Sequence, residues 1–500
     1  MHIRRTFFDL PLHRDTGFYV SNFTILNRKI NYSLGWNAHF AFCGKVLPEL
    51  FYSGIYLRYG GERYSFYSRI YYATLNYFIG IIVGISAYSL TGANPYSYLI
   101  GLIIYGFLSS KPFFGVYFES AEQFEILPQT LALLLISWWM KSNNNWLVFI
   151  AFSLIFLDAF FAKLSSIIFC FVVSVMFVIK FGLMIHVGGA FLFSFFSFCI
   201  WTTWNKKNLF LLFFPALHHE KYWSPNINLQ RVLLQISRKT KLLLKILSTD
   251  GSFILMAPII GNFILGKCDL SFQILCAVCA GFLLTYYAQP GLIWYYTIPL
   301  IPSLTLLATL GLIHSIEANR TIGLTFFLFS MVSLFAIHML RYRGSIEAVN
   351  LKIWKPYGSF MAEQNMGLKK IIMRLRNMVK NDKLFLYGVC NQLYAYLGTA
   401  YPTRLVCGAA WLDHIKSDWQ IEINNAFLKN APQFIFASDK FFNVEVMEKN
   451  LGLKYIFVES FCQDFKLFRL QNRLTRLNQN IQARPYETSL AFQARESGVY

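Results

Sequence analysis

The stretch WLVFIAFSLIFLDAFFAKLSSIIFCFVVSVMFVIKFGLMIHVGGAFLFSFFSFCIWTT, residues 146–203, decides the class of this protein. It contains three successive apolar runs, near 146–162, 164–180 and 185–203, and only three of its 58 residues are formally charged. A helix of roughly 20 apolar residues can cross the hydrocarbon core of a bilayer, because it rises about 1.5 Å per residue. The stretch is therefore typical of consecutive membrane-spanning helices.

The rest of the chain has the same membrane character. Hydrophobic residues make up 56% of the 500 residues and charged residues 14%, whereas soluble domains usually carry about 25% charged residues. Together with those three runs, seven others predict an all-α polytopic membrane bundle of about ten transmembrane helices over residues 71–341. These seven runs lie near 71–90, 97–110, 126–140, 253–266, 270–287, 292–313 and 321–341.

The two ends of the chain are more polar than this bundle. Residues 1–70 are expected to form a first outer loop, and Met1–Arg14 is polar and basic, unlike a signal peptide. Residues 342–480 predict a small α/β domain outside the membrane, and residues 481–500 a disordered tail. The expected strands of that domain are the short apolar runs at 384–387, 434–436 and 455–458.

Basic residues in the short loops predict an orientation. Lys141, Lys180, Lys267 and Arg320 fall in alternate loops between the apolar runs. Under the positive-inside rule these loops face the cytoplasm. The first loop, the segment 205–252 and the C-terminal domain are then expected to be extracytoplasmic.

The formal net charge of +20 indicates an anionic partner. Because the basic residues lie mostly between and after the apolar runs, we expect lipid headgroups or a lipid phosphate rather than nucleic acid. The segment 205–252 has eight basic and two acidic residues, and its apolar residues recur at near-helical spacing. This pattern predicts a basic amphipathic helix on the membrane surface. Its Arg238, Lys239 and Lys241 either anchor the helix to anionic lipid or clamp a lipid phosphate.

Two acidic sites lie in loops that face outward in this arrangement. Asp15 could take a proton from an acceptor hydroxyl or hold a cation against a phosphate, or it could be an ordinary loop residue or cap. Glu119 and Glu122 precede an apolar helix, where the helix dipole alone favours acidic residues. Because both sites fall on one predicted side of the membrane, a shared site is expected.

Other candidates lie near the ends of apolar runs. Lys163 separates two runs and either snorkels to the interface or contacts a phosphate. Tyr296 lies in a segment rich in proline, which either kinks its helix or places the outer helix end at the same cavity. Among nine cysteines, Cys276 and Cys279 form a C-x-x-C inside an apolar run, and we interpret them as structural.

Taken in order, these motifs resemble the GT-C superfamily of membrane glycosyltransferases. The resemblance is to bacterial members related to dolichyl-phosphate-mannose protein mannosyltransferases and to aminoarabinose transferases acting on lipid A. Two features depart from the family: Thr16 stands where an acidic residue is common, and the family's transmembrane helix before the Asp loop has no counterpart here. The matching segments are Asp15–Tyr19, Trp36 with Lys45–Pro48, Glu122–Pro128, Lys163 and Tyr295–Pro302.

The resemblance implies an enzyme of the bacterial inner membrane. It would move a sugar from a polyprenyl-phosphate donor to a lipid, glycan or protein acceptor on the outer face. Asp15 would be the general base and Glu122 the second catalytic residue. The substrate contacts would come from Arg14, Tyr19, Lys45, Glu119, Lys163, Arg238, Lys239, Lys241 and Tyr296.

Other functions and a metal requirement stay open. No cofactor motif is evident in the sequence, and a divalent cation is an option. A transporter or flippase of lipid-linked sugars predicts repeated halves, which we do not find. An inactive GT-C-like scaffold is the other alternative.

Overall fold

The structure is a computed structural model of the chain. Apart from four further single residues or short pieces (266, 397, 425 and 427–429), it describes residues 46–109, 122–163, 166–204, 229–249, 252–264, 268–289, 297–351, 372–379, 384–387, 431–438, 444–461 and 465–473.

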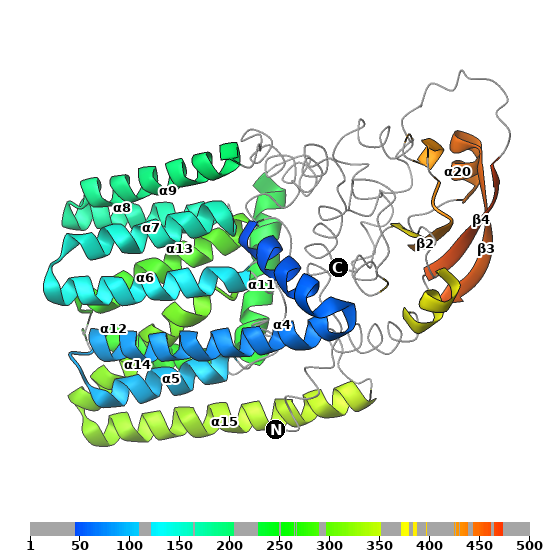
Figure 1. Cartoon of the computed structure of the whole chain (residues 1–500). Coiled ribbons are helices and arrows are strands. Elements are labelled where there is room, and N and C mark those ends of the chain that lie inside the picture. The colour runs from blue at the N-terminus through cyan, green and yellow to red at the C-terminus, as the bar shows by residue number, and fades with distance from the viewer. Residues whose placement is uncertain are drawn as a thin grey trace.

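A bundle of apolar helices dominates the part of the chain that the structure describes, and its helices run side by side (Figure 1). Each of the ten apolar runs overlaps a helix, so the predicted all-α membrane bundle is confirmed. The boundary expected at residue 70, between the first outer loop and the bundle, falls inside the first of the ten helices. They are α4 (Val46–Leu90), α5 (Pro95–Ser109), α6 (Glu122–Ser142), α7 (Asn145–Phe161), α8 (Ile167–Phe181), α9 (Met184–Trp204), α12 (Met256–Ile264), α13 (Leu270–Ala288), α14 (Leu300–Ala318) and α15 (Arg320–Leu351).

The outer surface of the bundle is apolar, as a lipid-facing surface must be. Ile179 on α8 is 79% exposed, and Ile185 and Trp204 on α9 are 85% and 84% exposed. Among the described residues, four segments are long and apolar enough to cross a membrane: Ile70–Leu90, α9, α13 and α14. Five further apolar helical segments among the described residues are shorter, and of these α12 has only nine residues preceded by the 3₁₀ turn η4 (Ser252–Leu255).

Helix α14 is the centre of the bundle. Every residue from Leu300 to Ile313 is buried, and the helix contacts α4, α5, α6, α12, α13 and α15. Gly311 allows α12 to come close, because a Cβ at that position would lie 2.3 Å from the carbonyl oxygen of Pro258. Small residues of this kind let membrane helices pack backbone to backbone.

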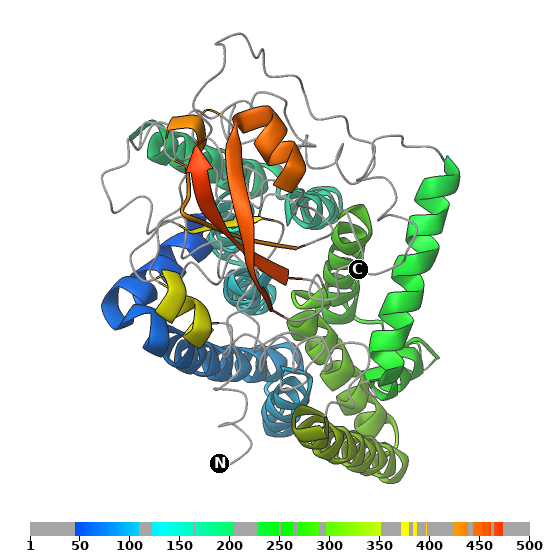
Figure 2. The same cartoon turned by 90° about the vertical axis from the view of Figure 1, so that its right-hand side faces the viewer.

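The two ends of the bundle differ in chemistry. Lys141 and Lys180 lie in the last turns of α6 and α8, and Arg320 begins α15, so these three basic residues share one end. Helix α11 (Leu229–Thr249) lies at the opposite end and runs across the direction of the bundle helices (Figures 1 and 2). The amphipathic helix expected within 205–252 is therefore present.

The C-terminal region contains a four-stranded sheet, drawn in yellow to red at the end of the chain in Figure 1. The strand order is β1-β2-β4-β3; β1 and β2 are parallel, whereas the β2–β4 and β3–β4 pairs are antiparallel. Its three expected strands are present, and β4 adds a fourth. The elements are β1 (Leu384–Tyr387), β2 (Phe434–Ser438), α20 (Val444–Leu451), β3 (Leu453–Phe461) and β4 (Phe465–Arg473).

Candidate functional site

A buried carboxylate lies at the α11 end of the bundle. Glu125 is in the first turns of α6, and its side chain is 2% exposed. A second carboxylate, Asp158 in the last turn of α7, is also 2% exposed. An ionisable side chain inside a membrane bundle is costly, so such residues are usually paired and often functional.

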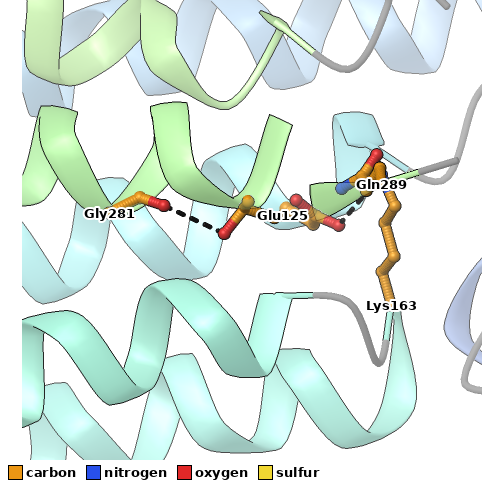
Figure 3. A network of polar contacts seen from close by, with 5 residues as sticks. Glu125, Lys163, Gly281 and Gln289 are labelled. Atoms are coloured by element: carbon orange, nitrogen blue, oxygen red, sulfur yellow. Dashed lines mark hydrogen bonds and ion pairs between the residues drawn. The ribbon is translucent and has the colours of Figure 1, made fainter. Parts of the chain in front are cut away.

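Lys163 supplies the positive charge of this site. Its backbone N–H donates to the Asp158 carbonyl just past the end of α7, which turns the side chain into the bundle. The Lys163 Nζ donates to Gln289 Oε1 at 3.1 Å and lies 4.0 Å from Glu125 Oε1 (Figure 3). Because Gln289 is the C-cap of α13, the contact joins three segments that are distant in sequence.

Further buried polar atoms surround Asp158. The Gln129 amide, one turn after Glu125 on α6, lies next to the Asp158 carboxylate. Gln129 Oε1, Asp158 Oδ1 and Ser166 Oγ are buried without a hydrogen-bond partner among the described residues. Buried polar groups usually have hydrogen-bond partners, so these atoms retain unused hydrogen-bonding capacity.

Lys239 joins α11 to the end of α13. Its Nζ donates to the carbonyl oxygens of Tyr286 and Tyr287, each at 2.9 Å, and also to the carbonyl oxygen of Gln289. A cation is favourable there because the last carbonyls of a helix lack helical partners and carry partial negative charge. Burial lowers the pKa of Lys239 to about 8.

Three further basic residues of α11 are turned away from the protein. Arg238, Lys241 and Lys245 are exposed, and their spacing of three and four residues places them on one side of the helix. A second side carries exposed apolar residues, and a third packs on the protein through Lys239 and Ile246. A helix with these three sides fits the membrane surface, with its apolar side toward lipid and its basic side toward headgroups. The exposed apolar residues of that side are Val232, Leu233, Ile236 and Leu244, and one more exposed leucine, Leu234, lies on the basic side one turn before Arg238.

Four of the predicted site residues lie at described positions with their side chains. Lys163 is in the buried network, while Arg238 and Lys241 are on the exposed basic side of α11. Lys239 was likewise expected to contact substrate, but its ammonium is turned inward onto protein carbonyls. The reason is angular: adjacent residues on a helix are separated by about 100°, so Lys239 cannot share the side of Arg238.

The remaining predicted site residues lie at the edge of the described chain or outside it. Glu122 begins α6, one turn before Glu125, and only its backbone is described. The expected meeting of Asp15 and Glu122 therefore stays a prediction. Outside the described residues lie Arg14, Asp15, Tyr19, Lys45, Glu119 and Tyr296.

Sequence reasoning missed Glu125, Gln129 and Asp158. Their signal was weak but present: Glu125 follows Glu122 at helical spacing, and Asp158 is an acid inside an apolar run. No group of three or more His, Cys, Asp or Glu side chains that could hold a metal occurs among the described residues.

Two solved structures have a fold similar to that of this chain. One is ArnT from Cupriavidus metallidurans in the apo state, with a TM-score of 0.54, and the other is the same organism's ArnT bound to undecaprenyl phosphate, with a TM-score of 0.58. The chain has the ArnT fold. In both comparisons the identity is 12%, and the match covers 92% of this chain and 94% of ArnT.

The ArnT fold covers the bundle and the C-terminal region together, so both belong to one architecture. The fold that the resemblance implied is thereby confirmed. Neither a scan against protein-family models nor a search of curated proteins finds a match.

Proposed function

We propose that this protein is a membrane glycosyltransferase that moves a sugar from a polyprenyl-phosphate donor to a lipid, glycan or protein acceptor on the outer face of the membrane. One observation carries the proposal. In the fold of ArnT, which has been solved with undecaprenyl phosphate bound, this chain places a buried lysine and two buried carboxylates at the end of the bundle where a basic helix lies.

The reaction requires a base and a stabilised leaving group. An acceptor hydroxyl attacks C1 of the sugar, the bond from C1 to the phosphate oxygen breaks, and the phosphate leaves with the electron pair. We assign the hydroxyl proton to Asp15, as the GT-C resemblance implies. Glu122 and Glu125, one turn apart on α6, would orient the acceptor.

The leaving phosphate needs positive charge. Lys163 is the ammonium that the described part of the site holds in the bundle interior, where an electrostatic interaction is stronger than in water. Arg238 and Lys241 on the exposed side of α11 would hold the lipid phosphate at the membrane surface. Lys239 is not assigned to phosphate binding, because its three N–H donors already face carbonyl oxygens.

A transfer assay with the purified protein tests the proposal. A radiolabelled polyprenyl-phosphate sugar is supplied in detergent with membrane lipid and glycan acceptors, and both products are measured. The proposal expects free polyprenyl phosphate and a labelled acceptor in equal amounts. If the donor stays intact but crosses the bilayer of proteoliposomes, the flippase alternative is correct. If the donor is bound without cleavage or movement, the protein is a scaffold.

A further inference from the structure

We propose that Lys239 is a positioning residue of this site: from α11 it fixes the end of α13, so that Gln289 holds the Lys163 ammonium in place. The inference rests on the proposed function for its catalytic consequence, but the link between the three residues is a matter of geometry. It makes the surface helix α11 part of the site without any contact between Lys239 and substrate.

The first step is the contact between Lys239 and α13. An ammonium has three N–H donors and no acceptor, and Lys239 directs its donors at the carbonyls of Tyr286, Tyr287 and Gln289. These carbonyls belong to the last turn of α13 and its C-cap, where the helix itself offers few or no partners. The Lys239 side chain is fully buried, so water does not compete for these bonds.

The second step runs through Gln289. Its backbone carbonyl accepts from Lys239, and its side-chain Oε1 accepts from Lys163 at 3.1 Å. One residue therefore carries both contacts, and its extended backbone (φ −67°, ψ 144°) sets the direction in which its side chain leaves the main chain. If the carbonyl is released, the amide oxygen is no longer fixed opposite Lys163.

The third step concerns the charge balance at Lys163. Its Nζ lies 4.0 Å from Glu125 Oε1, which is longer than a direct hydrogen bond, and Asp158 is a second carboxylate nearby. Without the Gln289 oxygen, the ammonium would shift toward a carboxylate. The positive charge of Lys163 would then be neutralised by a carboxylate of the site and would no longer stabilise the departing phosphate.

Lys239 can be changed without undocking α11. The Tyr286 hydroxyl donates to the Lys239 backbone carbonyl at 3.1 Å, and the Thr240 and Tyr287 hydroxyls lie 2.9 Å apart. Ile246 adds a buried apolar contact further along the helix. None of these contacts uses the Lys239 ammonium, so Lys239→Met removes the three carbonyl bonds while α11 keeps its place.

The chain offers a matched control at the opposite end of α13. Lys180 Nζ donates to Gln273 Oε1, so Lys180→Met also removes a lysine that joins another helix to α13. Gln273 lies in the first turn of that helix, far from Gln289. A general effect of loosening α13 would appear in both variants, and an effect on the site only in Lys239→Met.

The kinetic test compares Lys239→Met, Lys239→Arg and Lys180→Met in the transfer assay. Lys239→Met should lower kcat by roughly 10- to 100-fold, as expected for a misplaced group, with little change in KM for the lipid donor. Lys239→Arg keeps N–H donors and should recover part of kcat, while Lys180→Met should behave as wild type. An unchanged kcat in Lys239→Met, or no recovery with Lys239→Arg, overturns the proposal.

The second test needs no activity, so a failure of the proposed function does not affect it. Unfolding midpoints are measured for Lys239→Met, Lys163→Met and the double variant in detergent. Coupling through Gln289 predicts that the two losses are not additive, whereas Lys180→Met combined with Lys163→Met should be additive. Additive losses in both pairs overturn the proposed link. If no wild-type transfer is found but the first pair is coupled, only the glycosyltransferase assignment fails.

Discussion

At the scale of the residue, Asp15 carries the sharpest test of the chemistry, although it lies outside the described residues. General-base catalysis usually contributes 10²–10⁴-fold, so Asp15→Asn should lower single-turnover transfer by about that factor. Donor binding should change little, because the amide is nearly isosteric and the phosphate is held by other groups. If Asp15→Asn transfers sugar at the wild-type rate, the general base must be another carboxylate, Glu119 or Glu122.

The Lys163–Glu125 pair predicts an effect on stability that is independent of catalysis. Removing one member of a buried ion pair leaves an uncompensated charge and typically costs about 3–5 kcal/mol. Lys163→Met should therefore lower the unfolding midpoint more than Lys180→Met, since Lys180 is exposed. The double variant Lys163→Met/Glu125→Gln should recover part of the loss. A double variant as unstable as the sum of its parts would contradict the pairing.

The pH dependence of kcat should report on Lys239. Burial lowers its pKa to about 8, and its ammonium lies over the ring of Tyr286. Above pH 8 the neutral amine has two N–H donors for three carbonyls, so kcat should fall. The unfolded chain keeps a pKa near 10.5 and binds more protons between pH 8 and 10.5, so folding stability gains with pH there.

Because kcat should fall above pH 8 while folding stability gains, the two effects can be told apart in one pH profile. Lys239→Arg should lack the decline near pH 8, because a guanidinium does not titrate in this range. The profile is measured as kcat against pH beside the unfolding midpoint of the same samples. A decline that persists in Lys239→Arg, or that coincides with unfolding, would assign it to another group.

At the scale of the element, α11 should contribute to donor affinity through its exposed basic side. Arg238 and Lys241 each gain about 1 kcal/mol near an anionic surface, so replacing both with Gln should raise KM for the lipid donor by up to about 30-fold. The effect should weaken as salt rises. The matched control is Lys141→Gln/Lys180→Gln at the other end of the bundle. Equal KM values for the two double variants would leave α11 with an anchoring role only.

The elements themselves were largely predictable, whereas their contacts were not. The ten apolar runs and the amphipathic period of α11 follow from local patterns, which a helix satisfies by itself. The contact between Lys163 and Gln289 joins residues 126 positions apart, and no local pattern encodes it. Lys239 illustrates the same limit, because composition marked the segment as basic while only the packed structure shows which cation is buried.

At the scale of the whole molecule, the orientation in the membrane is the decisive prediction. If Lys141, Lys180 and Arg320 mark the cytoplasmic end, the sheet formed by β1 to β4 is extracytoplasmic. A single cysteine at Lys454, which is exposed on β3, should then react with an impermeant maleimide in intact spheroplasts. A cysteine at Ser142 should react only after permeabilisation. Both single-cysteine variants are made in a background without other reactive cysteines. The reverse pattern would place the site on the cytoplasmic face.

The central position of α14 has a consequence for biogenesis. Translation delivers α4 to α13 into the membrane before α14 emerges, yet α14 is buried over Leu300–Ile313 and contacts both early and late helices. The helices inserted first therefore cannot complete their packing until α14 is inserted, so final assembly follows insertion of the early helices. Nascent chains stalled before Leu300 should accordingly be sensitive to membrane proteases, and resistance should arise abruptly once α14 has left the ribosome.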